Sequence, residues 1–539
     1  MRLIPLALLG IPLFAWYHSG TPQAQGTPPQ SADAQQCAAL VSPEFEAIPD
    51  APTRIVSARV VDVPPAPPQA PPNSPVAVLA ASPIKQFCQV QGYVAPQNKF
   101  ELRLPLPSQW NGKFHLTPCA GYCGVLSPNF CNPPLARGYA AITGNGGHDG
   151  APGFDGLWAA NNPNLQEDFA WRHNHVIALA GKAIATKYYG KPISKSYMAG
   201  CSKGGHATLM EAQRFPEDFD GLISAAPVYD LVGRIIAGAW WAQAVNGSQG
   251  GSILDRSVAE TVQRSVLAKC GAQAGVDDGV VTDPASCDWK PEMAACGGGT
   301  ATSCLTPPQV QAVKKMMSPV VDSRGRVVYS AADIVGTATE WEGMHFGRGG
   351  NPSAPRAYAN YILHEQFLKY MADPTVRANI DPLRFDFDRD PASLERARKL
   401  YNATSTDLRA FKARGGKLLM WHGLSDASIT ATSSIEYYQG VEKAMGGRAQ
   451  TQEFFRLFLL PGMHHCAGGP GFTEFDALTL IENWVEKGQA PDVMIATQVT
   501  GGAAVRTRPI YPYPVLARYS GQGDPKQASS FVPLDPRRK

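Results

Sequence analysis

Short apolar runs separated by Pro- and Gly-containing turns dominate the first part of the chain. The runs at residues 100–104, 113–116 and 139–143 have the length and spacing of β-strands. Residues 164–189 instead place apolar side chains three or four positions apart, which predicts an amphipathic helix that covers a sheet. Another apolar run follows at 197–199. This alternation of strands and helices predicts the α/β class.

The alternation is interrupted once, from about residue 228 to residue 413. This stretch reads as irregular, with glycine clusters, four cysteines and scattered tryptophans. We interpret it as an inserted lid, which would shape a substrate site and exclude water from it. The elements predicted after it are strands at 417–426 and 454–460 and helices at 434–445 and 473–487, the last with Thr473 as N-cap and Gly488 as terminator.

The length of the chain supports more than one folded unit. A chain of 539 residues exceeds what one compact core usually accommodates, and its 44% hydrophobic content is enough to bury two. We predict a large lid domain inserted into an α/β core. The predicted parts are a leader (1–24), an N-terminal extended segment (25–75), a catalytic core (76–227 and 414–539) and the lid domain (228–413).

The N-terminus has the pattern of a signal peptide, with Met1-Arg2 before an apolar run from Leu3 to Tyr17. A membrane anchor is the weaker alternative, because about 15 apolar residues fall short of the roughly 20 that span a bilayer. A net charge of only +3 predicts neither nucleic acid nor an anionic membrane as partner. Eleven cysteines favour disulfide bonds and therefore a secreted or periplasmic protein.

A serine between glycines lies between the apolar run 197–199 and a helical pattern at 207–214. The segment is Gly200-Cys-Ser-Lys-Gly-Gly205, which contains Gly-x-Ser-x-Gly with Ser202 at its centre. A strand, a tight turn and a helix in this order form a nucleophile elbow, in which glycines allow the strained turn that exposes the serine hydroxyl. The motif alone is weak evidence, because short Gly-Ser turns are common in loops.

Two downstream segments supply the partners that a serine nucleophile needs. Asp426 ends a buried-strand pattern, and His465 follows the strand pattern 454–460. The order Ser, Asp, His is that of the α/β-hydrolases. A serine alcohol becomes a good nucleophile when an imidazole takes its proton and a carboxylate fixes the imidazole tautomer. If Cys201 and Cys466 pair, the bridge would bring the serine and the histidine together.

Other interpretations of these residues are weaker. His464 is the competing base, and Asp426 could be an ordinary turn aspartate. A metal site made of His422, His464, His465 and Cys466 lacks the ligand spacing of known metal motifs, because adjacent histidines point in different directions. His173 and His175 fit packing or surface positions on the helix predicted at 164–189.

Four segments together resemble the tannase and feruloyl esterase family, which also contains the mono(2-hydroxyethyl) terephthalate hydrolases. They are Gly-Cys-Ser-Lys-Gly-Gly (200–205), Trp-His-Gly-Leu-Ser-Asp (421–426), Leu-Pro-Gly-Met-His-His-Cys (460–466) and Arg-Thr-Arg-Pro-Ile-Tyr-Pro-Tyr-Pro (506–514). The resemblance implies a serine esterase that cleaves esters of aromatic acids (feruloyl or other hydroxycinnamoyl, galloyl, or terephthalate monoester) through an acyl-enzyme. The alternative is an inactive hydrolase fold used for binding or adhesion, which the presence of all three catalytic residue types disfavours.

The same resemblance implies a set of disulfide bonds. The implied pairs are Cys37–Cys88, Cys201–Cys466, Cys270–Cys287 and Cys296–Cys304. Cys119, Cys123 and Cys131 remain, and since at most two of them can pair, one thiol should be free.

The resemblance also places an oxyanion-binding loop at residues 117–124. Proline has no N–H to donate, so Pro118 cannot serve there. We expect the donors to be the backbone N–H groups of Gly121 and of Lys203, the residue after the nucleophile. The alternative is that this loop is only a turn closed by a disulfide.

The family carries a calcium loop in the lid, and residues 270–281 occupy its place. Gly271 and Ala274 stand where the family has liganding aspartates, so only the Asp278 carboxylate and the carbonyls of Val276 and Val280 remain. Ca²⁺ normally takes six to eight oxygen ligands, several of them charged. We therefore expect no required cofactor and weak calcium binding at most, unless Asp277 or Asp283 replaces the missing ligands.

Overall fold

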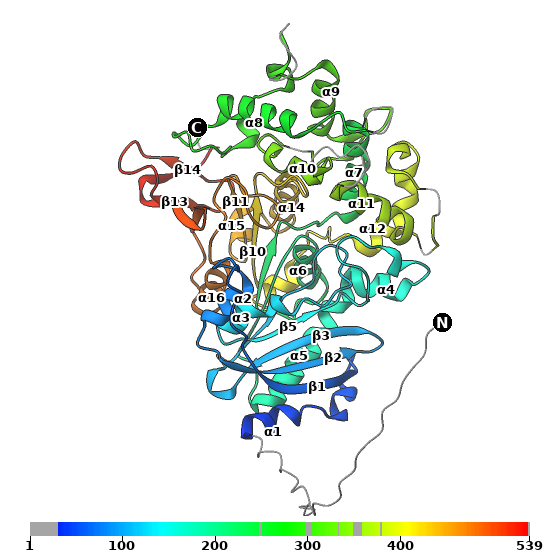
Figure 1. Cartoon of the computed structure of the whole chain (residues 1–539), viewed down its shortest axis with the longest axis vertical. Coiled ribbons are helices and arrows are strands. Elements are labelled where there is room, and N and C mark those ends of the chain that lie inside the picture. Colours follow the sequence, from blue (N-terminus) through cyan, green and yellow to red (C-terminus); the bar gives the residue numbers. More distant parts are fainter. Residues whose placement is uncertain are drawn as a thin grey trace, which may run out of the picture.

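A nine-stranded sheet forms the centre of the structure, a computed structural model (Figure 1). The structure describes residues 31–246, 251–297, 304–332, 334–348, 358–373, 375–377 and 380–536. Strands β1, β2, β3 and β5 pair antiparallel, and the sheet continues in parallel through β4, β6, β7, β10 and β11. In spatial order the strands are β1 (Thr53–Asp62), β2 (Gln86–Val94), β3 (Asn98–Pro105), β5 (Ala140–Gly144), β4 (Lys113–Leu116), β6 (Lys195–Cys201), β7 (Gly221–Ala225), β10 (Lys417–Gly423) and β11 (Phe455–Leu460). This mostly parallel sheet confirms the predicted α/β class.

Helices cover both faces of this sheet, and the strand sequences show why. Alternate residues of a strand point to opposite faces, so Leu418 and Met420 of β10 join one hydrophobic cluster while Leu419 and Trp421 join another. The first face is covered by α5 (His173–Tyr189), α6 (Lys203–Arg214) and α14 (Ala431–Ala444), and the other by α2 (Pro75–Ala81), α3 (Asn132–Ala136) and α16 (Ala477–Lys487). The short helix α15 (Arg448–Gln452) precedes β11.

Two predicted helices differ in detail from the structure. The single helix expected at 164–189 is α4 (Pro163–Glu167), a five-residue π-helix (Asp168–Arg172) and α5, in one continuous run. The helix expected at 473–487 ends at Gly488 in the left-handed conformation, as predicted. Its predicted N-cap, Thr473, is wrong: Asp476 accepts the capping hydrogen bond from Thr479, while the Thr473 amide pairs with Thr497.

Of the segment predicted as extended, residues 25–75, the described part from residue 31 on contains a helix and an edge strand. Residues 32–38 form α1 (Ala32–Ala38), and β1 pairs with β2 from Thr53↔Val94 to Asp62↔Gln86 at the edge of the sheet. The Pro-rich stretch that follows β1 obscured this strand, although β1 itself is rich in β-branched residues that favour strands. The predicted leader, residues 1–24, lies outside the described residues.

Residues 226–416, which connect β7 to β10, form an insertion above the parallel strands, green to yellow in Figure 1. The sequence reads as irregular there, yet the insertion is largely helical and has its own hydrophobic core around Trp241 and Trp341. One reason is that α7 is buried on nearly all sides and so shows no apolar stripe. Its elements are α7 (Leu231–Val245), α8 (Arg256–Cys270), α9 (Pro307–Met316), β8 (Val320–Val321), β9 (Val327–Tyr329), α10 (Trp341–Met344), α11 (Ala359–Gln366), α12 (Glu395–Tyr401) and α13 (Arg409–Ala413).

The C-terminal residues form two small antiparallel ribbons beside the sheet. They are β12 (Met494–Thr500) with β13 (Ala503–Ile510), and β14 (Leu516–Tyr519) with β15 (Phe531–Leu534). The amide of Tyr519 donates to the carbonyl of Ala274, which links the tail to the insertion.

Within the described part of the chain, every helix is too short or too polar to span a membrane.

Candidate active site

Ser202 lies at the turn between β6 and α6, where the sequence predicts an elbow. Its backbone has φ 62° and ψ −118°, a strained conformation for a residue with a side chain. The turn requires glycine on both sides. A Cβ on Gly200 would come within 2.5 Å of Pro118, and one on Gly205 within 2.3 Å of the Ala225 carbonyl oxygen. The small residues therefore allow α6 to begin directly against β7, with Ser202 at its N-terminal end.

A disulfide bond joins the residue before Ser202 to the residue after His465. Cys201 and Cys466 have Cα atoms 5.9 Å apart, although they are 265 residues apart in sequence. The bridge holds the end of β6 against the loop that follows β11, and Ser202 and His465 line the same cavity.

The structure contains all four disulfide pairs that the resemblance implies. A fifth bond joins Cys119 to Cys123 and closes the loop expected to bind an oxyanion. Cys131 remains as the single free thiol, and it is buried. Burial raises the pKa of this thiol above the range in which it would ionise.

Asp426 is fully buried beneath His465 and accepts hydrogen bonds on both oxygens. His465 Nδ1 donates to Asp426 Oδ2 at 2.7 Å, and the amides of Ser428 and Ile429 each donate to Oδ1 at 2.8 Å. His422 Nε2 lies 3.2 Å from the same Oδ2. Because that nitrogen also contacts the Ile429 carbonyl at 2.6 Å, it must carry the proton. Besides His465, the Asp426 carboxylate therefore accepts hydrogen bonds from His422 and from the amides of Ser428 and Ile429, which fix its position.

Asp426 and His465 stabilise each other's charged forms. Burial alone would raise the pKa of Asp426, but the neighbouring His465 and His422 hold it well below its usual range. Burial alone would lower the pKa of His465, but the Asp426 carboxylate together with Glu340 outweighs burial, and the pKa is raised. His465 is thus a stronger base than an isolated imidazole, with Nδ1 committed to Asp426 and Nε2 left to exchange a proton.

Glu340, from the insertion, is a site residue that sequence reasoning missed. Its carboxylate accepts the backbone N–H groups of Ala427 and His465 at 2.7 and 3.0 Å. No local motif marks it, because its partners lie far away in the sequence. The competing base, His464, is turned elsewhere: its Nε2 pairs with the hydroxyl of Thr339 at 2.8 Å.

A cavity of about 400 Å³ lies between the core and the insertion, within the size range of small-molecule sites. Its walls are mainly apolar and aromatic, and Ser202 and His465 lie among them. The lining residues are Ala120, Gly121, Tyr122, Gly153, Phe154, Ser202, Lys203, Val228, Leu231, Arg234, Ile235, Met344, Leu363, Ser428, Ile429, His465 and Cys466.

Both expected oxyanion donors border this cavity. Lys203 is the first residue of α6, so its N–H has no partner within the helix. Gly121 has φ +60°, and a Cβ there would lie 2.7 Å from the Gly153 carbonyl oxygen. The Lys203 side chain turns inward, where its ammonium lies 3.2 Å from His206 Nδ1 and 4.6 Å from the centre of the Phe169 ring. Burial lowers its pKa to about 7.

The expected calcium loop does not fit a cation. The Asp278 carboxylate is buried and pairs with the Arg508 guanidinium at 2.6 Å, so its charge is already neutralised. The Asp278 carbonyl accepts from Arg506 at 3.1 Å. Val280 packs its side chain into the hydrophobic cluster beside α16, and Val276 adds no charge. Arg508 therefore already pairs with the one carboxylate that the expected calcium site would supply.

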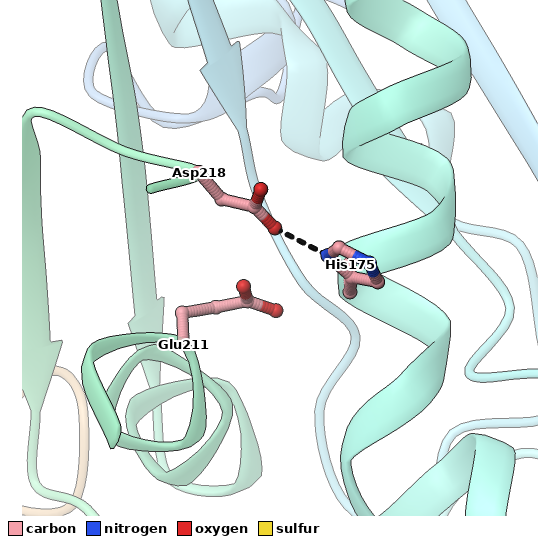
Figure 2. Close-up of side chains that lie close together, drawn as sticks. All are labelled: His175, Glu211 and Asp218. Atoms are coloured by element: carbon pink, nitrogen blue, oxygen red, sulfur yellow. Dashed lines mark hydrogen bonds and ion pairs between the residues drawn. The ribbon is translucent and has the colours of Figure 1, made fainter. Parts of the chain in front are cut away.

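Figure 2 shows a separate cluster of His175, Glu211 and Asp218 between α5 and α6. His175 Nδ1 and Asp218 Oδ2 lie 2.6 Å apart, which is a hydrogen bond without space for an ion. Burial and the Asp218 charge hold the pKa of Glu211 well above its usual range, which disfavours the charged form that would bind a metal ion. The alternative metal set fails as well, since Cys466 is in a disulfide and the fully buried His422 pairs with Ser434.

Comparison with solved structures identifies the fold. Feruloyl esterase B from Aspergillus oryzae superposes with a TM-score of 0.76 at 24% identity, covering 93% of this chain and 100% of that chain. The tannin acyl hydrolase from Aspergillus niger gives a TM-score of 0.74 at 20% identity, covering 93% and 94%. The nine-stranded sheet with its inserted helical segment is thus an α/β-hydrolase fold.

Comparison of sequences identifies the family. Residues 82–534 match the family described as Tannase and feruloyl esterase. The mono(2-hydroxyethyl) terephthalate hydrolase of Piscinibacter sakaiensis is 33% identical over 522 residues, covering 85% of this chain and 86% of that protein. A probable feruloyl esterase of Arthroderma benhamiae is 30% identical over 550 residues, covering 98% of each. The protein is a carboxylic ester hydrolase, and it belongs to the tannase and feruloyl esterase family.

Proposed function

We propose that this protein hydrolyses esters of aromatic carboxylic acids with Ser202 as nucleophile, His465 as general base and Asp426 as the carboxylate that orients the base. The observation that carries the proposal is the 2.7 Å hydrogen bond from His465 Nδ1 to Asp426 Oδ2, at the wall of a cavity that Ser202 also lines. This bond selects the tautomer in which Nε2 accepts a proton.

The reaction follows from these roles. Ser202 Oγ attacks the ester carbonyl carbon while His465 Nε2 takes the hydroxyl proton, and the N–H groups of Gly121 and Lys203 stabilise the oxyanion that forms. The intermediate then collapses, and the leaving alcohol departs with the proton from His465. Water attacks the acyl-enzyme by the same sequence of proton transfers, which releases the acid and restores the serine.

The cavity supports an aromatic acyl group as the substrate part that enters it. Tyr122 and Phe154 contribute aromatic walls, and Ile235, Met344 and Leu363 contribute aliphatic ones. Such a surface favours a planar apolar ring. Two relatives are named as a mono(2-hydroxyethyl) terephthalate hydrolase and a probable feruloyl esterase. The family resemblance adds galloyl esters as a third candidate substrate class. A panel of methyl ferulate, methyl gallate and mono(2-hydroxyethyl) terephthalate would rank the three by kcat/KM.

We also propose that the protein functions outside the cytoplasm, in the periplasm or the medium. Five disulfide bonds support this location, because in reducing compartments such as the cytoplasm the cysteines would stay reduced. Detection of the protein in the periplasmic or culture fraction, with its N-terminus shortened, is the expected result. Recovery of the intact chain only from the cytoplasm would contradict it.

Covalent labelling with a phosphonate serine probe tests the catalytic assignment. Ser202→Ala is expected to abolish labelling and to lower kcat by several orders of magnitude, leaving about 10³–10⁴-fold catalysis over water from the oxyanion hole and binding. Ser428→Ala, which changes another serine of the same cavity, is the control and should be labelled like the wild type. Wild-type protein that reacts with neither the probe nor any ester of the panel would instead indicate an inactive hydrolase fold used for binding.

A further inference from the structure

One carboxylate of the insertion, Glu340, accepts backbone hydrogen bonds at the predicted base and beside the carboxylate that orients it. Glu340 ends a short 3₁₀-helix (Ala338–Glu340). Its Oε2 accepts the N–H of Ala427, the residue after Asp426, at 2.7 Å, and its Oε1 accepts the N–H of His465 itself at 3.0 Å. These partners are 87 and 125 residues away in sequence.

We propose that Glu340 is a positioning residue that holds the histidine and the aspartate in register and makes their geometry depend on the insertion. This inference rests on the proposed function, in which His465 acts as the base and the Asp426 carboxylate orients it. Glu340 touches no reacting atom in this scheme. It acts through the two loops that carry His465 and Asp426.

The hydrogen bonds around these loops show what Glu340 adds. The core joins the two loops to each other, through the amide of Leu424 on Leu460 and the amide of Ser425 on Met463. Arg234 of the insertion also donates to the carbonyl of Ser428, but this bond reaches only the loop that carries Asp426. Glu340 accepts one N–H from each loop, so a single carboxylate ties both to the wall of the cavity. The preceding residue, Thr339, strengthens this tie by its hydrogen bond to the His464 ring.

The charge of Glu340 reaches the same histidine. Burial and repulsion from Asp426 raise the pKa of Glu340 to about 7, while the two amides and His465 oppose that shift. In its charged form Glu340 in turn favours protonated His465, which adds to the raised pKa of the base. Among the described residues, the other charged or titratable groups that line the same pocket are His464, Glu342, Arg348 and Tyr358. Loss of the Glu340 carboxylate should therefore lower the pKa of His465 and also make the position of His465 less fixed.

Kinetics of Glu340→Gln test the proposal. The amide side chain has the same shape, but it keeps one acceptor oxygen and turns an NH₂ group toward the other backbone N–H. We expect kcat to fall by about 10- to 100-fold, the scale of a small misplacement of catalytic groups, with KM changed less than about twofold. The midpoint of the acid limb of the kcat/KM profile should also move to lower pH, because the imidazolium has lost a nearby carboxylate.

Glu436→Gln is the matched control. Glu436 lies on α14 of the core and accepts a 2.7 Å hydrogen bond from Ser330 of the insertion, so it joins the same two parts away from the site. Its variant should keep the wild-type kcat and pH profile. Equal losses in both variants, or a loss in Glu340→Gln that is confined to KM or leaves the acid limb in place, would overturn the proposal.

Two further measurements separate the possible failures. Rates are expressed per active site titrated with the phosphonate probe, so that unfolded protein does not count as slow enzyme. Glu340→Ala removes both acceptors and should be slower than Glu340→Gln; wild-type turnover in either variant would refute the positioning role. If Ser202→Ala kept full activity, the proposed function itself would be wrong, whereas loss of activity in Ser202→Ala with none in Glu340→Gln would refute only the role of Glu340.

Discussion

The Cys201–Cys466 disulfide is expected to contribute both to stability and to catalysis, and comparison with a second disulfide can separate the two contributions. The perturbation is the double variant Cys201→Ala/Cys466→Ala, and the matched control is Cys270→Ala/Cys287→Ala in the insertion. The two bonds span 265 and 17 residues. The chain-entropy relation gives stabilisations of about 5.6 and about 3.1 kcal/mol at 25 °C for loops of these lengths. These values are upper guides, since residual structure in the unfolded chain reduces them.

The effect of the two double variants on kcat should not simply follow their effect on stability. Cys201 adjoins Ser202 and Cys466 adjoins His465, so opening this bridge lets nucleophile and base move apart. We expect a loss of about tenfold to a hundredfold in kcat, whereas the control should keep the wild-type rate. Urea unfolding followed by tryptophan fluorescence gives the free energies of unfolding, and ester hydrolysis per titrated active site gives the rates.

Two results would refute this reasoning. Full activity in Cys201→Ala/Cys466→Ala would show that Asp426, Glu340 and the core hydrogen bonds position His465 without the bridge. Equal losses of rate in both double variants would show that the losses report general destabilisation. A peptide map made without reduction must first find the 201–466 pair in wild-type protein, and free thiols at both positions in active enzyme would contradict the premise.

Three other outcomes can be checked on the same protein. Because the base must be neutral and the pKa of His465 is raised, activity should fall as the pH drops through a midpoint above 6.5; Asp426→Asn should move that midpoint down and lower kcat by about 10⁴-fold, and an unmoved midpoint would contradict the pairing. Chelation should leave the melting temperature and activity unchanged, because Arg508 already neutralises Asp278; a loss reversed by Ca²⁺ and not by Mg²⁺ would refute this. Gly205→Ala should destabilise the protein by about 1–3 kcal/mol in thermal unfolding, and an unchanged melting temperature would show that the elbow tolerates a Cβ.

Features encoded in a few adjacent residues could be predicted from the sequence. The elbow needs glycines beside Ser202, so its motif is local. The parallel strands before Asp426 and His465 contain the apolar runs 418–421 and 457–460, which are typical of buried strands. The structure brings Asp426 and His465 into contact and places Ser202 on the same cavity. Their catalytic roles remain predictions until the variants are measured.

Features that depend on distant partners could not be predicted. Glu340 lies in a segment without periodic pattern, and its role depends on amides more than 80 residues away. The N-cap of α16 is Asp476 and not Thr473 because Thr473 already pairs with β12. The calcium loop illustrates a third case: its sequence shows missing carboxylates, but only the fold shows that Asp278 faces Arg508.

The order of the site residues along the chain has a consequence for synthesis. Ser202 leaves the ribosome 264 residues before Cys466, the residue that completes the disulfide beside the base. At about 5–20 residues per second this interval lasts roughly 13–53 s. For most of that time β10 and β11 have not been synthesised, so Ser202 lies near the unfinished edge of the sheet without Asp426 or His465. If His465 is the base that activates Ser202, as we propose, any nascent or truncated product that ends before His465 should be inactive toward esters, however well its first strands have folded.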